Sequence, residues 1–181
     1  MIFHKTPLEG CYTIEFSPMA DDRGWFSRVY CQKEFEAIEH QHSFVQFNHS
    51  FNHKKGTIRG MHYQNPPFQE IKLIRCISGA VYDVVIDLRK NSPTFLHYFG
   101  VELSAQNHMM IYIPHGFAHG FQTLEDETQL IYHHTEFYQP GHEAGIHYLD
   151  PMIQINWPLP PSILSERDKN LLFINESFKG I

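Results

Sequence analysis

The residues most capable of chemistry in this chain are histidines and cations set among apolar, strand-like runs. The segment Gly56–Gln64 carries Arg59 and His62, and Lys72 leads another such run. The connection Pro114–Phe121 carries two more histidines. A strand that packs in a core would hold apolar residues at these positions. The polar residues therefore predict a ligand cavity inside a barrel or sandwich.

Histidine is the unusual part of the composition, with 14 copies. Such enrichment fits metal binding, acid–base chemistry or a polar surface. In a regular strand side chains alternate between faces, so Arg59 and Met61 would share one face and His62 would lie on the other. The two glycines of this segment make a bulge plausible, and a bulge would let Arg59 reach the same cavity.

The elements that must position these residues are short β-type runs between Val45 and about Tyr138, separated by Gly, Pro and Asn. The expected strands are 71–77, 80–88, 95–103, 109–113, 120–124 and 129–135. Only Gln32–His40 and the tail after Pro158, where Ser165–Asp168 resembles a helix start, look helical.

This pattern predicts an all-β fold in a single domain over residues 1–181. A jelly roll, an up-and-down barrel and an immunoglobulin-like sandwich remain open. The last of these lacks its Cys/Trp/Cys spacing here.

The composition excludes several classes of function. The net charge is -6 and no long Lys/Arg cluster occurs, which argues against a nucleic-acid partner. No apolar run approaches the roughly 18 residues of a membrane span, and the N-terminus lacks a signal-peptide core. Three cysteines without C-x-x-C spacing indicate neither a disulfide framework nor a zinc site. We expect a cytoplasmic protein that does not bind membranes.

Several short motifs, taken together in order, are similar to those of the dTDP-4-dehydrorhamnose 3,5-epimerase family. They are Asp22–Phe26, Gln46–Ser50, Gly56–Gln64, Asp83–Arg89, Pro114–Phe121, Tyr132, Tyr138, Glu143, Trp157-Pro158 and Ser165–Asp168. The resemblance implies a cupin-type β jelly roll and a homodimer that exchanges strands. It also implies inversion of C3 and C5 in a 4-keto-6-deoxyhexose carried by a nucleoside diphosphate, without a metal or cofactor.

The resemblance further implies the catalytic residues. A proton beside a ketone can leave when its electrons move onto the carbonyl oxygen. The enzyme therefore needs a base, a group that stabilises the oxyanion and an acid on the opposite face. By resemblance His62 is the base and Asp168 its charge partner. Lys72 matches the positive group near the C4 oxygen, and Tyr132 matches the acid.

Ten further positions match residues that bind the substrate. They are Arg23, Phe26, Arg28, the nucleotide-side pair Gln46 and Asn48, Arg59, His119, Tyr138, Glu143 and Arg167. Arg23, Arg59 and His119 would surround the sugar and diphosphate, because the arginine fork donates two hydrogen bonds to phosphate. Glu143 would contact the sugar and Tyr138 would stack on the base.

Three positions depart from the family pattern. Arg28 stands where the family usually has Glu, near the nucleotide, and Phe47 stands where an acidic residue is common. Arg167 replaces the usual Lys. These departures leave the nucleotide and the exact sugar open.

A metal site is the main alternative for the histidines. Metal-binding cupins cluster a His-x-His pair with a nearby Glu and a later His. Here His40 and His42 have that spacing in a polar helix–loop region, whereas His62 is followed by Gln64 where the second ligand would be. The sequence therefore does not predict a required metal.

Other relatives of this scaffold give two more alternatives. A single-centre epimerase or a keto-isomerase would act on a related nucleotide sugar, and retention of Tyr132 favours inversion at both centres. A non-catalytic sugar-binding cupin would be expected to lose His62 or Asp168, and this chain keeps both.

Overall fold

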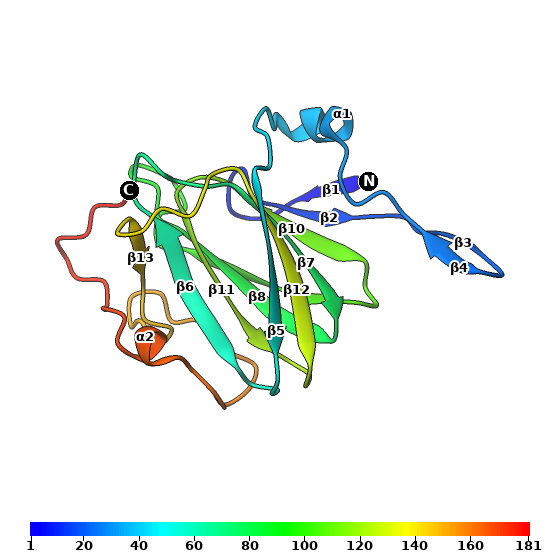
Figure 1. Ribbon diagram of the computed structural model, residues 1–181. Helices are drawn as coiled ribbons and strands as arrows, with labels where there is room; N and C mark the ends of the chain where they lie inside the picture. Colours follow the sequence, from blue (N-terminus) through cyan, green and yellow to red (C-terminus); the bar gives the residue numbers. More distant parts are fainter.

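Two antiparallel sheets packed face to face form the body of the protein in the computed structural model, which describes residues 1–181 (Figure 1). The six-stranded sheet has the order β1-β2-β10-β7-β12-β5, and the five-stranded sheet has the order β13-β6-β11-β8-β9. A separate hairpin, β3–β4, projects from the body near the N-terminus (Figure 1).

The elements are mostly short. The strands are β1 (Ile2–Lys5), β2 (Tyr12–Glu15), β3 (Met19–Asp21), β4 (Gly24–Phe26), β5 (Gln46–Asn52), β6 (Ile58–Gln64), β7 (Lys72–Ser78), β8 (Ala80–Asp87), β9 (Tyr98–Ser104), β10 (Met109–Ile113), β11 (Phe117–Thr123), β12 (Thr128–His134) and β13 (Glu143–Gly145). The helices are α1 (Gln32–Phe35), a 3-10 turn at Glu36–Ile38 and α2 (Glu166–Lys169). No helix has the length and apolar character that crossing a membrane would require.

The main core lies between the two sheets. Strands β7 and β12 contribute Ile74 and Leu130 from one sheet, and β8 and β11 contribute Val85 and Phe121 from the other. Each is at most 2% exposed. Burying such a side chain contributes about 1.5–3 kcal/mol, so the alternation of these strands holds the sheets together.

The sheet order decides between the predicted architectures. In an up-and-down barrel sequence neighbours pair, whereas here β2 pairs with β10 and β12 pairs with both β5 and β7. Long crossovers of this kind make the protein a cupin-type jelly roll, which confirms the predicted fold class.

Several expected boundaries were wrong. The strands β1–β4 escaped prediction because they are short and, apart from β2, mostly exposed. The predicted helix over Gln32–His40 ends early, because Glu39 adopts a left-handed conformation with φ 58° after the 3-10 turn. Strand β11 begins at Phe117, so His119 lies in a buried central strand and not in a connection.

The tail helix was predicted at the right place. Ser165 precedes α2, and its hydroxyl accepts a hydrogen bond from the Asp168 backbone N–H at 3.0 Å. This N-cap satisfies one of the free N–H groups at the helix start. It also fixes the position from which the Asp168 side chain points.

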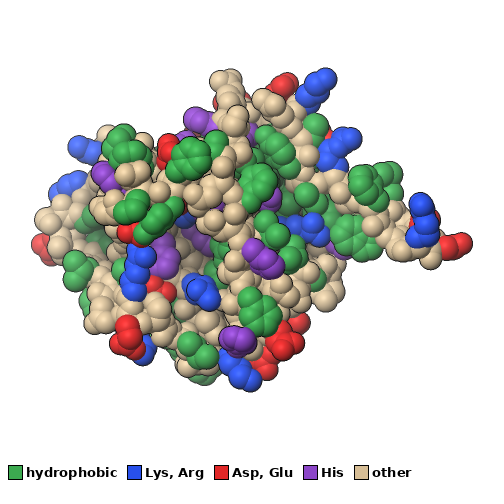
Figure 2. All heavy atoms as spheres, viewed as in Figure 1, with side chains coloured by type: hydrophobic (Ala, Val, Ile, Leu, Met, Phe, Trp, Pro, Cys, Tyr) green, Lys and Arg blue, Asp and Glu red, His purple; other side chains and the backbone are tan.

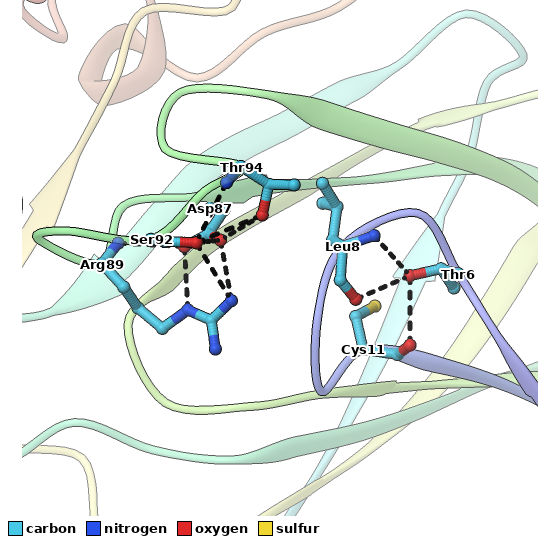
Figure 3. Close-up of polar contacts among 7 residues, drawn as sticks. All are labelled: Thr6, Leu8, Cys11, Asp87, Arg89, Ser92 and Thr94. Atoms are coloured by element: carbon cyan, nitrogen blue, oxygen red, sulfur yellow. Dashed lines mark hydrogen bonds and ion pairs between the residues drawn. The ribbon is translucent and has the colours of Figure 1, made fainter.

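A buried carboxylate ties down the loop between β8 and β9 (Figure 3). Asp87 is fully buried and accepts hydrogen bonds from Arg89 Nε at 2.9 Å, Ser92 Oγ at 2.5 Å and Thr94 Oγ1 at 2.7 Å. Burial would raise the pKa of Asp87, but the hydrogen bonds from Arg89, Ser92 and Thr94 together hold it below its usual value.

A second hydrogen bond of this kind fixes a turn. Between β1 and β2, Thr6 Oγ1 donates to the Cys11 carbonyl at 3.0 Å.

Asp87→Ala should therefore destabilise the protein by about 3–5 kcal/mol, since it leaves Arg89 without its buried partner. Because the folded-state pKa is depressed, the stabilisation is present above the unfolded pKa of about 4 and is lost as the pH falls through the folded value. Urea unfolding at pH 7 and pH 3 measures both effects. Glu102→Gln, on an exposed position, is the control. Equal midpoints for Asp87→Ala and wild type at pH 7 would contradict the assignment.

Candidate active site

A β-bulge in β6 brings two predicted site residues to one cavity. Across the β6–β11 pair His62 faces His119 and Arg59 faces Phe121, so Gly60 and Met61 together oppose a single residue. Met61 is fully buried in the core, while Arg59 and His62 both line the cavity.

Gly60 makes this bulge possible. Its φ is +116°, and a Cβ there would lie 2.6 Å from the Cα of Gly120 on the neighbouring strand. No other residue type combines that backbone angle with so close an approach. The irregularity that the two glycines suggested is therefore present at the point where the site needs it.

The cavity opens between the two sheets and has a volume of about 560 Å³. Histidine and cationic side chains gather on this face of the molecule, between β6 and β5 (Figure 2). The residues around it include Asn48, Ser50, Arg59, His62, Lys72, His119, Tyr132, His134, Ser165, Arg167 and Asp168. A second, smaller cavity adjoins it and shares His62, Lys72 and His134.

His62 and Asp168 are in direct contact, as predicted. His62 Nε2 lies 2.7 Å from Asp168 Oδ1, and the Asp168 side chain is nearly buried. Burial would raise the pKa of Asp168, but its hydrogen bonds, the one to His62 first, hold the pKa below its usual value. The ionised carboxylate can only accept, so Nε2 carries a proton and Nδ1 is left as the basic nitrogen.

Tyr132 lies on the opposite wall. It belongs to β12 in the six-stranded sheet, whereas His62 belongs to β6 in the five-stranded sheet. The Tyr132 hydroxyl lies 3.0 Å from Ser50 Oγ. Burial raises the pKa of Tyr132 well above its ordinary value, so the side chain is a neutral phenol with a proton to give.

A second histidine–carboxylate pair lies beside the first. His119 Nε2 is 2.9 Å from Asp83 Oδ2, and both side chains are buried. Burial raises the pKa of Asp83, and its other carboxylate oxygen has no hydrogen-bond partner. The His119 ring is 6.3 Å from the Tyr132 ring. Asp83 therefore orients a histidine in the cavity wall.

Lys72 is buried and not solvated. Its side chain is 9% exposed, and Nζ lies 3.0 Å from Glu70 Oε1. Because the ammonium is in the cavity wall and desolvated, it can stabilise negative charge on a bound ligand more strongly than a surface lysine would.

Seven of the ten predicted substrate-binding residues surround the two cavities: Gln46, Asn48, Arg59, His119, Tyr138, Glu143 and Arg167. They are also linked to one another. The Tyr138 backbone N–H donates to Gln46 Oε1 at 3.1 Å, and its hydroxyl donates to Glu143. Arg167 Nη1 lies 3.5 Å from Glu143, which leaves most of its guanidinium free to bind a ligand.

The other three predicted residues lie away from the cavity within this chain. Arg23 and Phe26 belong to the projecting hairpin, and the Arg23 side chain is 90% exposed and pairs with Asp21 at 2.6 Å. Arg28 Nη1 pairs with Glu34 at 2.9 Å. The cation that replaces the family's usual Glu thus has a partner on α1.

The histidines weighed as metal ligands do not form such a site. His40 Nδ1 lies 3.1 Å from the Tyr112 hydroxyl, inside an aromatic cluster with Phe35 and Phe44. No group of three or more His, Cys, Asp or Glu side chains is arranged to hold a metal ion.

Sequence reasoning missed several polar residues in or behind the cavity wall, among them Ser50, Glu70, Asp83 and His134. For Asp83 a signal existed, because it interrupts the apolar run Ala80–Leu88 in the middle of a strand. Glu70 and His134 lie 64 positions apart, and neither has a local pattern that would pair them.

The chain matches the dTDP-4-dehydrorhamnose 3,5-epimerase family over residues 5–176. The enzyme of that name from Shigella flexneri is 44% identical over 167 residues, 92% of each chain. A dTDP-4-dehydrorhamnose 3-epimerase from Streptomyces niveus is 37% identical, over 94% of this chain and 82% of its own length.

Solved structures agree with the sequences. The crystal structure of dTDP-4-dehydrorhamnose 3,5-epimerase from Bacillus anthracis, with TDP and PPi bound, has a TM-score of 0.93 to this protein. The two are 41% identical, and the match covers 96% of this chain and 99% of the other. With the fold, the ordered motifs and nearly the full length in agreement, this chain belongs to the dTDP-4-dehydrorhamnose 3,5-epimerase family.

Proposed function

We propose that this protein inverts C3 and C5 of dTDP-4-keto-6-deoxyglucose, giving dTDP-4-dehydrorhamnose. The observation that carries this proposal is the placement of His62 and Tyr132 on opposite walls of one cavity that Lys72 also lines. Inversion requires a proton to leave one face of a carbon and another to arrive on the opposite face.

In the proposed mechanism His62 Nδ1 takes the proton from the carbon next to the C4 ketone. The C–H electron pair becomes a C=C bond and the carbonyl oxygen becomes an enolate oxygen, which Lys72 stabilises. Tyr132 then donates its proton to the other face of the carbon as the carbonyl re-forms. His62 and Tyr132 return to their starting states by exchanging protons with water.

The substrate's charge fits the cavity. Arg59 and Arg167 line it, and a guanidinium binds phosphate through two hydrogen bonds. Tyr138 is more than half exposed at the rim of the adjoining cavity, where it can stack on a nucleobase. A nucleoside diphosphate is made in the cytoplasm, and we place the enzyme there.

We further propose a homodimer in which the β3–β4 hairpin reaches the partner. Arg23 and Phe26 match substrate contacts yet lie outside this chain's own cavity. The hairpin exposes Trp25 and Phe26, and the edge strand β5 exposes Phe47 and Phe51. A second copy of the chain would cover these aromatic side chains and complete the site.

Mixing two defective variants tests this arrangement. Arg23→Ala and His62→Asn homodimers should each be impaired, but a mixed dimer holds one site with both changes and one intact site. Random mixing makes half the dimers mixed, so about a quarter of wild-type activity should return. His62→Asn mixed with His62→Ala, which can form no intact site, is the control. No recovery after unfolding and refolding together would contradict an Arg23 contribution in trans.

The product distinguishes the proposed function from single-centre inversion. The 3-epimerase among the relatives makes that second candidate specific. After incubation with dTDP-4-keto-6-deoxyglucose, borohydride reduction and sugar analysis should give 6-deoxy sugars of the L-manno and L-talo series. Sugars of the D-allo and D-gulo series would show inversion at C3 alone. If the only sugars recovered were the reduction products of unchanged substrate, the proposal would be overturned.

A further inference from the structure

A buried carboxylate, Glu70, joins two other side chains of the cavity wall. Glu70 Oε1 lies 3.0 Å from Lys72 Nζ, and Glu70 Oε2 lies 2.6 Å from His134 Nδ1. The three side chains are 12%, 9% and 9% exposed. Glu70 comes just before β7, whereas His134 ends β12, so the carboxylate bridges neighbouring strands of the six-stranded sheet.

The hydrogen bonds define the charges of this group. Burial opposes ionisation of Glu70, but Lys72 and His134 outweigh it and lower the pKa of Glu70 to about 2. The ionised carboxylate accepts a hydrogen bond from His134 Nδ1. Asn48 Nδ2 lies 3.2 Å from Nε2 on the other side of the ring. Lys72 and Glu70 form an ion pair.

His134 also fixes the surroundings of the pair. Its ring stacks on that of Tyr132, with centroids 6.2 Å apart and an angle of 19° between the planes. The chain of contacts from Asn48 through His134 to Glu70 therefore ends at the Lys72 ammonium. It connects the nucleotide-side residue, the acid and the oxyanion group of the proposed mechanism.

An ammonium buried without a partner loses its proton more readily, because burial disfavours the charged form. Glu70 uses only part of the donor capacity of Lys72, since an ammonium has three N–H groups. We infer that Glu70 is a positioning residue for the reaction: it keeps Lys72 charged and directed into the cavity, and His134 holds Glu70 in place. This inference rests on the proposed function, in which Lys72 stabilises the enolate oxygen.

Glu70→Gln tests the inference through the pH profile. Loss of one oxyanion-hole donor typically costs about 10²–10³ in kcat, and Lys72 remains here, so we expect kcat to fall by about 10- to 100-fold at pH 7.5 with KM little changed. The decline of activity at high pH should begin at lower pH than in wild type. Glu70→Asp keeps a carboxylate and should restore the wild-type profile in part.

Glu102→Gln, on an exposed part of β9, is the matched control and should behave as wild type. Circular dichroism and thermal unfolding show whether each variant is folded. If folded Glu70→Gln has the wild-type pH profile and kcat, the inference is wrong.

Acetylation of Lys72 gives a readout that does not depend on activity. Acetic anhydride reacts with the neutral amine only, so a paired, buried Lys72 should label slowly at pH 7.5 compared with the exposed Lys54. In Glu70→Gln the Lys72 labelling rate, measured by peptide mass spectrometry, should rise about tenfold, because the buried ammonium loses its charge partner.

The two readouts separate the possible failures. An inactive wild-type enzyme with the expected change in labelling would overturn the proposed function and keep Glu70 as the partner that holds Lys72 charged. An active enzyme whose Lys72 labels equally in wild type and Glu70→Gln would overturn the role of Glu70 and keep the function.

Discussion

His62→Asn should slow deuterium incorporation at both C3 and C5 by about 10²–10⁴-fold, the usual contribution of a general base. Asparagine can still donate to Asp168, which His62 Nε2 contacts at 2.7 Å, so the variant removes the basic nitrogen with little change in packing. The measurement is the rate at which proton signals of dTDP-4-keto-6-deoxyglucose disappear in deuterated water. Substrate binding, followed by dTDP competition, should change far less.

Two comparisons show whether the loss belongs to this histidine. His97→Asn, at an exposed position in the β8–β9 loop, should exchange both protons at the wild-type rate. Asp168→Asn should be less severe than His62→Asn, because the imidazole remains and only its charge partner is lost. If His62→Asn exchanged both protons at close to the wild-type rate, another group would be the base.

Tyr132→Phe should separate exchange from inversion. His62 can still remove protons from its own face in this variant, so washing-in of deuterium should continue. Return of a proton to the opposite face loses its donor, and formation of epimerised product should fall by about a further 10²-fold. The Ser50 hydroxyl, 3.0 Å from that of Tyr132, would lose its hydrogen-bond partner.

The matched control is Tyr148→Phe, a tyrosine that does not line either cavity. It should keep both rates. Equal losses of exchange and of inversion in Tyr132→Phe would make this residue a binding or structural one. Both rates come from one NMR time course, because exchanged substrate and inverted product have different signals.

The sequence allowed the strands around the site to be predicted, because β7, β8, β10 and β12 alternate or are continuously apolar and end at clear turns. The bulge in β6 could be suspected from Gly60 but not located, since a glycine alone does not say where pairing shifts. The short strands at the N-terminus carry no comparable signal, because most of their side chains are exposed.

The pairings within the site were beyond any local pattern. His62 and Asp168 lie 106 positions apart, and only the resemblance to a family linked them before the structure did. The pairing of Asp83 and that of Glu70 were missed for the same reason. Their partners, His119 and His134, come from strands that meet only after the sheets form.

For two residues of the β3–β4 hairpin, the sequence predicted substrate contacts that lie outside this chain's own cavity. Arg23 and Phe26 were predicted to bind substrate, and in this chain they point to solvent, away from the cavity. In the proposed dimer, these two side chains would contact the site of the second copy. Their role therefore depends on the proposed dimer, which the mixing experiment addresses.

The proposed function requires one enzyme to remove and replace the protons at both C3 and C5. NMR of dTDP-4-keto-6-deoxyglucose after incubation with the wild-type protein in deuterated water measures both events. Deuterium should appear at both carbons, with the inverted configuration at both. Deuterium at C3 alone, with C5 unchanged in label and configuration, would contradict the proposed function.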